Sequence, residues 1–417
     1  MQNICPLNQT EKTLCGLVAE VLFGTAFKPG ENIDWKAVYS ESKEQTVVIP
    51  AFLHYNMLKL GKEFTMEIQQ SVNQCIFQNV QNHSYHDYIH YLMEENNISY
   101  CILKGSVSAD YYPLNTMRQM GDVDFLVAKD DFSKAIEILK KDGFVLCGER
   151  HRHHVEFRKD RMSFEMHFDP PGIPDGVSGS LVRACFSDIL KRSRKVSDGT
   201  FTWVQPNEFH HGLIMLLHMQ RHLLAEGIGL RHLCDWAVFV NSFSEKDFQQ
   251  LFQSQLEKIG LWKFAQVISL VAHLGIGLPW QNWMGEEEIL AEAMFRDIFS
   301  GGNFGAKDEQ RAYEGLFISS RGQNSVKHTR FIQAILSINQ NIYINWPAVK
   351  TMKFLLPVGW VYFPIRKVYR VYTKKGKIDW LSAYYKSAKR KKLYQQLKLF
   401  EVGKITDCEK TKDSRDR

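Results

Sequence analysis

The chain has 417 residues, of which 44% are hydrophobic and 24% are charged, the balance of an ordinary globular protein with room for two or three domains. Its net charge of +6 is uneven, because residues 351–417 hold 18 lysines and arginines against 6 acidic residues, and the first 350 residues are mildly acidic. We expect this basic tail to contact an anionic partner, such as nucleic acid or a membrane surface; the simpler alternative is a solvated helix face.

The eight cysteines are scattered and form no Cys-x-x-Cys pair, which argues against a zinc cluster and against a disulfide scaffold. The first residues, "MQNICPLNQTEK", lack the basic and then apolar pattern of a signal peptide. No apolar run approaches the ~18 residues that a transmembrane helix needs. We therefore expect a cytoplasmic protein.

Residues 1–95 are predicted to be mainly helical. Leu14, Leu17 and Val21 recur at helical spacing. Residues 64–97 contain neither glycine nor proline, so they predict one long helix that ends at the paired asparagines.

The pattern changes after residue 95, where short apolar runs alternate with turns. A strand over 98–103 leads into the turn Lys104-Gly105-Ser106, and a short helix stops at Pro113. The next elements are predicted as a strand "GDVDFLV", an amphipathic helix over 129–143, a strand "FVLCG" and a hairpin that turns at 159–161.

Helical patterns return at residue 207 and continue to about 345, with a break at the glycine pair 227 and 229. The tail then predicts a basic amphipathic helix, "KIDWLSAYYKSAKRKKLYQQLKLF", followed by disordered last residues. The sequence therefore predicts an α+β fold in four regions: 1–95 helical, 96–205 a small mixed-sheet core, 206–345 helical, and 346–417 a basic, aromatic-rich tail.

Two aspartates interrupt the apolar run "GDVDFLV". Successive side chains of a strand point to opposite faces, so Asp122 and Asp124 share the face opposite Val123 and Phe125. Buried carboxylates are costly without a partner. Two of them on one face, about 7 Å apart at Cα, suit a hard divalent cation such as Mg²⁺. The alternative is a solvated or salt-bridged pair, for instance with Arg118.

The second arm of the hairpin, "MSFEMHF", offers a third carboxylate, because Ser163, Glu165 and His167 share one face. If this strand lies beside the aspartate strand, Glu165 completes the outline of a two-metal site. The alternative for Glu165 is the solvent face of an amphipathic hairpin. For His167, a role behind the metal ligands is as well supported as catalysis.

The turn at 104–106 offers the complementary half of a nucleotide site. A strand that ends in Gly-Ser and opens a helix presents backbone N–H groups to a phosphate. Lys104 and Ser106 add a charge and a hydroxyl. For Lys104 and Arg118, a salt bridge inside the site is the alternative to a phosphate contact.

The order of these elements resembles the DNA polymerase β-type nucleotidyltransferase superfamily, with Gly-Ser, then Asp-x-Asp, then a third acid on a later strand. More narrowly, "LKGSVSADYYPLNTMRQMGDVDFLV" with "FEMHF" resembles a bacterial group of uncharacterised nucleotidyltransferases. That group places R-x-x-G-D-[IV]-D-[IL]-L-V after K-G and later shows E-x-H. The matching positions here are Arg118, Gly121, Asp122, Asp124, Glu165 and His167. The helical flanks also look like this group, including "GLRHLCDW" with Arg231 and Asp235.

The resemblance implies a Mg²⁺- or Mn²⁺-dependent transfer of a nucleoside monophosphate from a nucleoside triphosphate, with ATP the expected donor, to a hydroxyl of a small molecule or protein. Asp122, Asp124 and Glu165 would be the catalytic metal ligands. The nucleotide would be bound by Lys104, Gly105, Ser106 and Arg118. The residues that contact and orient these binding groups would be His167, Arg231 and Asp235.

Two other classes of protein remain open at this point. A glycosyltransferase also uses Asp-x-Asp to bind a nucleotide sugar through a metal, but it normally has a larger parallel sheet before that motif. A non-catalytic module of the same fold would bind a nucleotide or a partner, although retention of all three acids argues against a degenerate site.

The histidines of the first helix after residue 207 recur at helical spacing, at His211, His218 and His222. The segment "HMQRH" lacks the glutamate of the HExxH zinc motif, so helix packing or contact with the sheet region is the favoured interpretation. Arg231 and Asp235 lie one helical turn apart and are most simply an ion pair.

Overall fold

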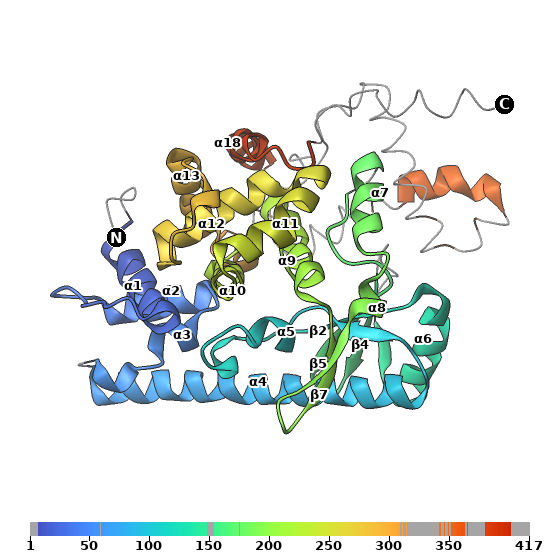
Figure 1. Ribbon diagram of the computed structural model, residues 1–417, viewed down its shortest axis with the longest axis horizontal. Coiled ribbons are helices and arrows are strands. Elements are labelled where there is room, and N and C mark those ends of the chain that lie inside the picture. The colour runs from blue at the N-terminus through green and yellow to red at the C-terminus, as the bar shows by residue number, and fades with distance from the viewer. Residues whose placement is uncertain are drawn as a thin grey trace.

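The computed structural model describes residues 7–308, except 59, 148–153 and 175, and after them residues 311, 314, 342, 346, 349, 352–362, 365 and 380–401. Helices form most of it, and a five-stranded mixed sheet lies above one long helix (Figure 1). The α+β class predicted from the sequence is therefore confirmed. None of the helices in these residues combines the length and the apolar character needed to cross a membrane.

Three short helices and one very long one form the N-terminal part. The first helix starts after Asn8, which forms a capping box with Glu11, and ends at Gly24 in the left-handed conformation with φ of 68°. The elements are α1 (Gln9–Phe23), α2 (Trp35–Glu44), α3 (Val48–Phe52), the 3-10 turn η1 (Tyr55–Met57) and α4 (Lys62–Glu95).

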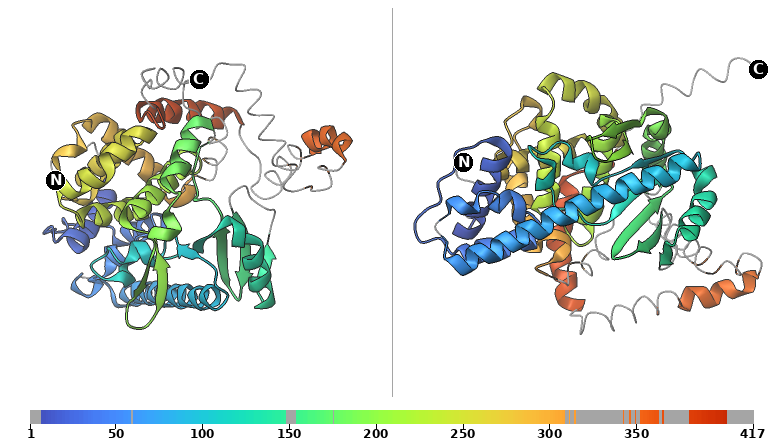
Figure 2. Two further views of the ribbon diagram at one scale, coloured as in Figure 1. Left: turned by 45° about the vertical axis from the view of Figure 1, so that its right-hand side comes forward. Right: turned by 90° about the horizontal axis from the view of Figure 1, so that it is seen from below.

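Helix α4 crosses the molecule from the N-terminal helices to the sheet (Figure 2, right). It has 34 residues, as its unbroken sequence predicts, and buries one stripe at helical spacing. The stripe is mainly apolar at its two ends, for example at Ile68 and Ile89. In the middle it is polar, and the buried side chains there are Asn79, Asn82, His83 and His86.

The sheet has the strand order β1-β2-β5-β4-β3. Strand β2 (Val123–Val127) is antiparallel to β1 (Tyr100–Ile102) and parallel to β5 (Met162–His167). The predicted hairpin is formed by β4 (His154–Lys159) and β5, and β3 (Val145–Cys147) pairs with β4 at the edge. His154 is the first residue of β4, where it pairs with His167 across the hairpin.

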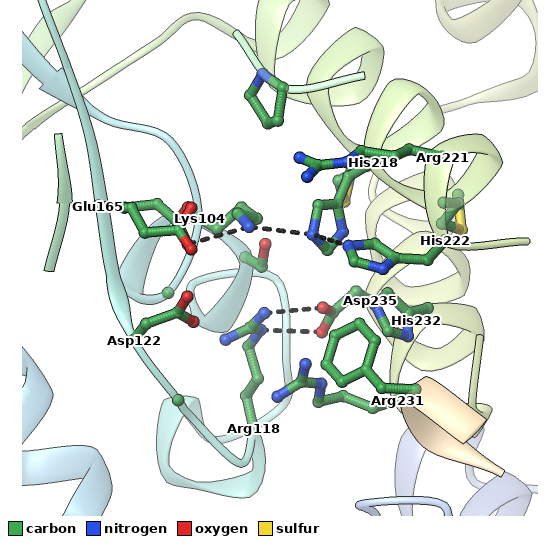
Figure 3. Close-up of a pocket in the computed structure, with 18 residues that line it drawn as sticks. Lys104, Arg118, Asp122, Glu165, His218, Arg221, His222, Arg231, His232 and Asp235 are labelled. Atoms are coloured by element: carbon green, nitrogen blue, oxygen red, sulfur yellow. Dashed lines mark hydrogen bonds and ion pairs between the residues drawn. The ribbon is translucent and has the colours of Figure 1, made fainter. Parts of the chain in front are cut away.

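The two faces of the sheet differ. Val123, Phe125 and Val127 lie in a hydrophobic cluster with apolar residues of α4 and of α6 (Phe132–Lys141). The alternate positions of β2 and β5 include Asp124 and Glu165, which line a cavity between the sheet and the C-terminal helices. Figure 3 shows Glu165 on the sheet side of this cavity. The alternation predicted from the sequence therefore separates core from cavity.

A segment with little predicted structure connects the sheet to the C-terminal helices. It contains α7 (Gly176–Cys185), α8 (Ile189–Arg192) and a hairpin of β6 (Arg194–Ser197) and β7 (Thr202–Gln205). This hairpin is not among the elements predicted from the sequence, although an Asp-Gly turn at 198–199 is a hairpin signal. Trp203 of β7 is fully buried in the cluster on the apolar face of the sheet.

In the described part of the chain, the C-terminal helices include α9 (Glu208–Leu224), α10 (Leu230–Asn241), α11 (Glu245–Ile259), α12 (Trp262–Ile276), α13 (Glu288–Gly301) and α18 (Trp380–Gln396). The predicted break at the two glycines separates α9 from α10, and α18 is the predicted basic helix. The other 3-10 turns found among the described residues are η2 (Asn115–Met117), η3 (Lys129–Asp131), η4 (Asn282–Met284), η5 (Asn303–Gly305) and η6 (Lys353–Leu355).

The first and last helical parts share one hydrophobic core. Apolar residues of α1, α2 and α3 lie in the same buried cluster as those of α9 to α13. The helical patterns expected between residues 309 and 345 lie almost wholly outside the described residues, as do residues 402–417 with the disordered end that the sequence predicts.

Candidate functional site

Three carboxylates converge at the start of β2. Asp122 directly precedes this strand, and Asp124 lies opposite Glu165 in the parallel pairing of β2 with β5. One oxygen from each of the three side chains lies within 4.8 Å of the others. Parallel pairing puts residues of equal register on the same face, so the fold brings together the three acids that the sequence analysis singled out.

Two positive groups neutralise this cluster. The Lys104 ammonium lies 2.9 Å from Asp124 Oδ2, and His167 Nε2 lies 3.1 Å from Asp124 Oδ1 and 3.3 Å from Glu165 Oε2. Burial raises the pKa of Asp124, but Lys104 and His167 outweigh burial and hold it below its usual value. Burial also lowers the pKa of His167, and the two carboxylates raise it further than burial lowers it. The salt-bridge alternative for Lys104 is thus the arrangement in this structure.

Asp122 is the most exposed of the three acids. The positive groups Lys104 and His167 pair with its neighbour Asp124 and not with Asp122. Repulsion from Asp124, and then burial, raise its pKa to about 6. A carboxylate with a raised pKa gains most when a cation binds, because the cation removes the repulsion between like charges. The cluster is therefore a charge distribution that favours a divalent cation.

The turn that precedes α5 (Ser106–Ala109) brings the backbone close to the acids. Gly105 has φ of 73° and ψ of −114°, and a Cβ at this position would lie 2.6 Å from Cε1 of His86. Only glycine fits such a conformation and such a contact. Gly105 lines the cavity, whereas the Ser106 side chain is fully buried and hydrogen-bonds with Nδ1 of His86.

Arg118 is held by a buried network rather than left free. Its Nε and Nη2 donate to the two oxygens of Asp235, both at 2.9 Å, and Tyr112 Oη donates to the same carboxylate at 2.8 Å. The ion pair expected between Arg231 and Asp235 is replaced by this bidentate pair. Arg231 instead donates from Nη1 to the carbonyl of Gln119 at 3.5 Å.

The loop that carries Arg118 is fixed by α4. Asn79 Nδ2 donates to the carbonyls of Asn115 and Arg118 at 3.1 and 3.0 Å, and Asn82 Nδ2 donates to the carbonyl of Gly121 at 3.0 Å. The buried asparagines in the middle of α4 therefore find their hydrogen-bond partners in this loop. Their bonds fix both ends of the segment between η2 and the aspartate pair.

The opposite wall of the cavity consists of α9, α10 and η5. In Figure 3, Asp122 and Glu165 lie on one side, and the side chains of α9 and α10 point toward them from the other. This wall is basic and aromatic, and the residues that line it include His218, Arg221, His222, Arg231, His232 and Phe304. The cavity therefore has an acidic wall from the sheet and a basic wall from the helices.

His218 connects the two walls. Lys104 Nζ lies 3.1 Å from His218 Nε2, and His222 Nε2 lies 3.0 Å from the same atom. Burial, and then Lys104, hold the pKa of His218 well below its usual value. His211 does not line the cavity; its Nε2 lies 3.3 Å from Ser108 Oγ, a packing contact with the sheet region of the kind favoured from the sequence.

Sequence reasoning missed several residues of this site. Arg221, His232 and Phe304 line the cavity, and His86 packs against the glycine turn. Nothing in the local sequence marks His232 or Phe304. The sequence pattern of α4 could have identified Asn79, Asn82 and His86 as buried, because they continue its apolar stripe at helical spacing.

A Gly turn after a strand, an Asp-x-Asp pair at the next strand and a third acid on a parallel neighbour follow the order in which this chain resembles nucleotidyltransferases. The family model described as "Uncharacterised nucleotidyltransferase" matches residues 31–276, more than half of the chain, and the chain belongs to this family. Membership makes the protein a transferase enzyme. No curated protein matches the chain.

Proposed function

We propose that the protein transfers a nucleoside monophosphate from a nucleoside triphosphate, ATP in the first instance, to a hydroxyl of an acceptor and releases pyrophosphate. The observation that carries this proposal is the pairing of the two walls. Three carboxylates suited to a divalent cation face Arg221 and Arg231 across one cavity. A triphosphate with its cation is the substrate whose charges match both walls.

The residues present fit a magnesium ion. Asp122, Asp124 and Glu165 offer hard oxygen donors within one cluster, the ligand type that Mg²⁺ or Mn²⁺ prefers. A bound Mg²⁺ would neutralise phosphate charge and position the triphosphate. We propose these three residues as its ligands.

The basic groups of the cavity would take the phosphates. The Arg231 Nε has no hydrogen-bond partner among the described residues, and burial, followed by the nearby Arg118, lowers the pKa of this guanidinium. A phosphate would supply the negative charge that Arg231 lacks. Lys104 and the backbone at Gly105 lie at the acidic wall, so we propose that they contact the triphosphate beside the cation.

Ser106 and Arg118 take a different role in this proposal. Their side chains are bonded to His86 and to Asp235. We propose that they position the glycine turn and the cavity wall. Asp235 and His167 would act in the same way, by orienting Arg118 and the carboxylates respectively.

The alternatives are less well supported. A nucleotide-sugar glycosyltransferase does not agree with membership of a nucleotidyltransferase family. A non-catalytic module would have no need to keep three convergent carboxylates next to a lysine, since such a cluster is costly without a cation to bind.

The test is calorimetric titration of the protein with ATP, with and without Mg²⁺. We expect binding that requires the cation and that is lost in Asp122→Asn with Asp124→Asn, a change that removes charge and keeps shape. Glu286→Gln, at an exposed position between η4 and α13, is the matched control and should bind ATP. ATP binding without a cation, or binding that survives the double substitution, would contradict the proposal.

The acceptor is best found by labelling. Incubation with each α-labelled triphosphate and a cell extract should place label on one molecule with the wild-type protein and on none with the double variant. Label on the protein itself would identify self-modification.

The basic C-terminal part belongs to this proposal as a contact with an anionic partner. Phe354, Val358 and Val361 are exposed apolar residues at helical spacing, and the stretch from 366 to 377 that follows them in sequence has six basic residues and no acid. We expect co-sedimentation with vesicles that contain anionic phospholipid and loss of it in Val358→Asp. Equal sedimentation of that variant would contradict the contact.

A further inference from the structure

The polar face of the sheet extends past the three acids to a pair of histidines. His154 and His167 are directly opposite each other in the antiparallel pairing of β4 with β5. Both side chains are buried, with relative exposures of 5% and 0%. Imidazole nitrogens are common ligands of transition-metal ions.

Glu165 lies beside both histidines. Its Oε2 is 3.3 Å from His167 Nε2 and 3.8 Å from His154 Nε2, and the centroids of the two rings are 4.9 Å apart. One donor atom from each of the three side chains lies within 4.8 Å of the others. His154 Nε2 also lies 3.8 Å from Glu156, so a second carboxylate is close behind the group.

We propose that His154, Glu165 and His167 form a second cation site, next to the carboxylate site, that takes a transition-metal ion of the Zn²⁺, Co²⁺ or Mn²⁺ class. Two imidazoles with one carboxylate suit these ions, whereas Mg²⁺ prefers oxygen ligands only. Glu165 belongs to both groups of ligands. The centre would then hold two unlike cations that share one carboxylate.

The location of the site explains two features of the sheet. His167 now supplies positive charge to both Asp124 and Glu165, and a cation bound beside it would supply that charge to the same carboxylates. His154 comes from a different strand, so the ligands are fixed by the register of the hairpin rather than by a flexible loop. Rigid strands are the kind of support that a metal site needs.

The proposal goes beyond nucleotidyl transfer, because it concerns metal binding by the sheet alone. Its test is a Co²⁺ titration of the metal-stripped full chain, followed by visible absorption. Four- or five-coordinate Co²⁺, the geometry expected at a site with two imidazoles and one carboxylate, absorbs visible light more strongly than six-coordinate Co²⁺ in oxygen sites, because its ligand field has no centre of symmetry. We expect one equivalent of the strongly absorbing species, and we expect an excess of Mg²⁺ to leave it in place.

The variants separate the two sites. His154→Gln should weaken Co²⁺ binding by about 10-fold or more, whereas Asp122→Asn should keep the strong absorption even though it loses Mg²⁺-dependent ATP binding. His273→Gln on α12, where Nδ1 contacts the Leu278 carbonyl, is the matched histidine control and should behave as wild type. Circular dichroism shows whether each variant is folded.

Strong absorption that is unchanged in a folded His154→Gln would overturn the proposal, as would complete displacement of Co²⁺ by Mg²⁺. These outcomes are distinct from failure of the proposed transfer. A protein that binds Co²⁺ through His154 but never binds ATP would retain this site and lose the function proposed above.

Discussion

At the scale of single residues, the shape of the site depends on a glycine as well as on the charged groups. Gly105 has a positive φ and touches the His86 ring, which in turn bonds Ser106. The glycine thus lets a buried helix side chain press against the turn that meets the carboxylates. An added methyl group has nowhere to go, because the ring is packed from behind.

We predict that Gly105→Ala destabilises the protein by about 2 kcal/mol or more, the sum of the backbone cost and the displacement of His86. Urea unfolding followed by circular dichroism measures the change. Gly61→Ala is the matched control, since Gly61 has a negative φ and nothing lies within 4 Å of the added atom. Equal stability of the two variants would contradict this prediction, since it would mean that the turn at Gly105 accepts a side chain without strain.

The acids of the site were predictable from sequence, and their neighbours were only partly so. The period of a strand is enough to place Asp122 and Asp124 on one face and to separate Glu165 from the core. The strand period does not predict which basic side chain pairs with each of these acids. Lys104 pairs with Asp124, and Arg118 pairs with Asp235 more than one hundred positions away, a contact that only the packing of α10 against the loop creates.

At the scale of elements, α4 acts as the platform of the site. Its apolar ends pack into the hydrophobic clusters, and its polar middle bonds to the loop that leads into β2. A loop of this length would be mobile if only its ends were fixed. The amide groups of α4 replace the backbone bonds that the loop cannot make with itself.

Removal of one such amide should loosen the loop. Asn79→Ala leaves the carbonyls of Asn115 and Arg118 without their donor, and we expect a loss of about 1–3 kcal/mol in unfolding free energy. Weaker ATP binding should accompany it, because Arg118 moves with the loop. Asn73→Ala, at an exposed position of the same helix, should change neither quantity; a similar loss in both variants would mean that the helix itself, and not the loop, was affected.

The helix boundaries were largely predictable and the tertiary role of α4 was not. Absence of glycine and proline over 64–97 gives its length, and the paired asparagines give its end. The buried polar positions of α4 could be predicted from their spacing. Their hydrogen-bond partners could not, because these lie on the loop before β2, whose conformation depends on α4 itself. Short strands such as those of β6 and β7 are missed because four residues give too little period to recognise.

At the scale of the whole molecule, many histidines are buried in neutral form. Burial lowers the pKa of His86 to about 3 and that of His211 to about 4. Below the ordinary histidine pKa of 6.5 the unfolded chain binds protons that the folded chain cannot. The contribution of these neutral histidines to stability is therefore full above pH 6.5 and falls as the pH drops below it.

We predict a loss of about 2 kcal/mol for each of these two histidines between pH 6.5 and about pH 5. Urea unfolding over this pH range measures the slope. His86→Gln should flatten the slope if the variant folds, whereas His54→Gln, at an exposed position, should not. A stability that is constant down to pH 5 would contradict the buried neutral state of these histidines.

The α+β class could be predicted from the order of the sequence patterns, which place helices on both sides of a short α/β segment. The hydrophobic core shared by the N-terminal and C-terminal helices could not be predicted. Nothing in the sequence tells that α1, α2 and α3 pack with α9 to α13, because the contacts join segments some two hundred residues apart and carry no local signature.

The reach of α4 has a consequence for how a substrate enters. The helix is about 51 Å long at 1.5 Å per residue, and it contributes to both hydrophobic clusters, with Ile68 and Val72 in one and Ile89 and Met93 in the other. One helix therefore contributes to both of the hydrophobic cores that support the cavity. We expect the cavity to be preformed, so that a nucleotide binds without a large rigid-body movement of its two walls.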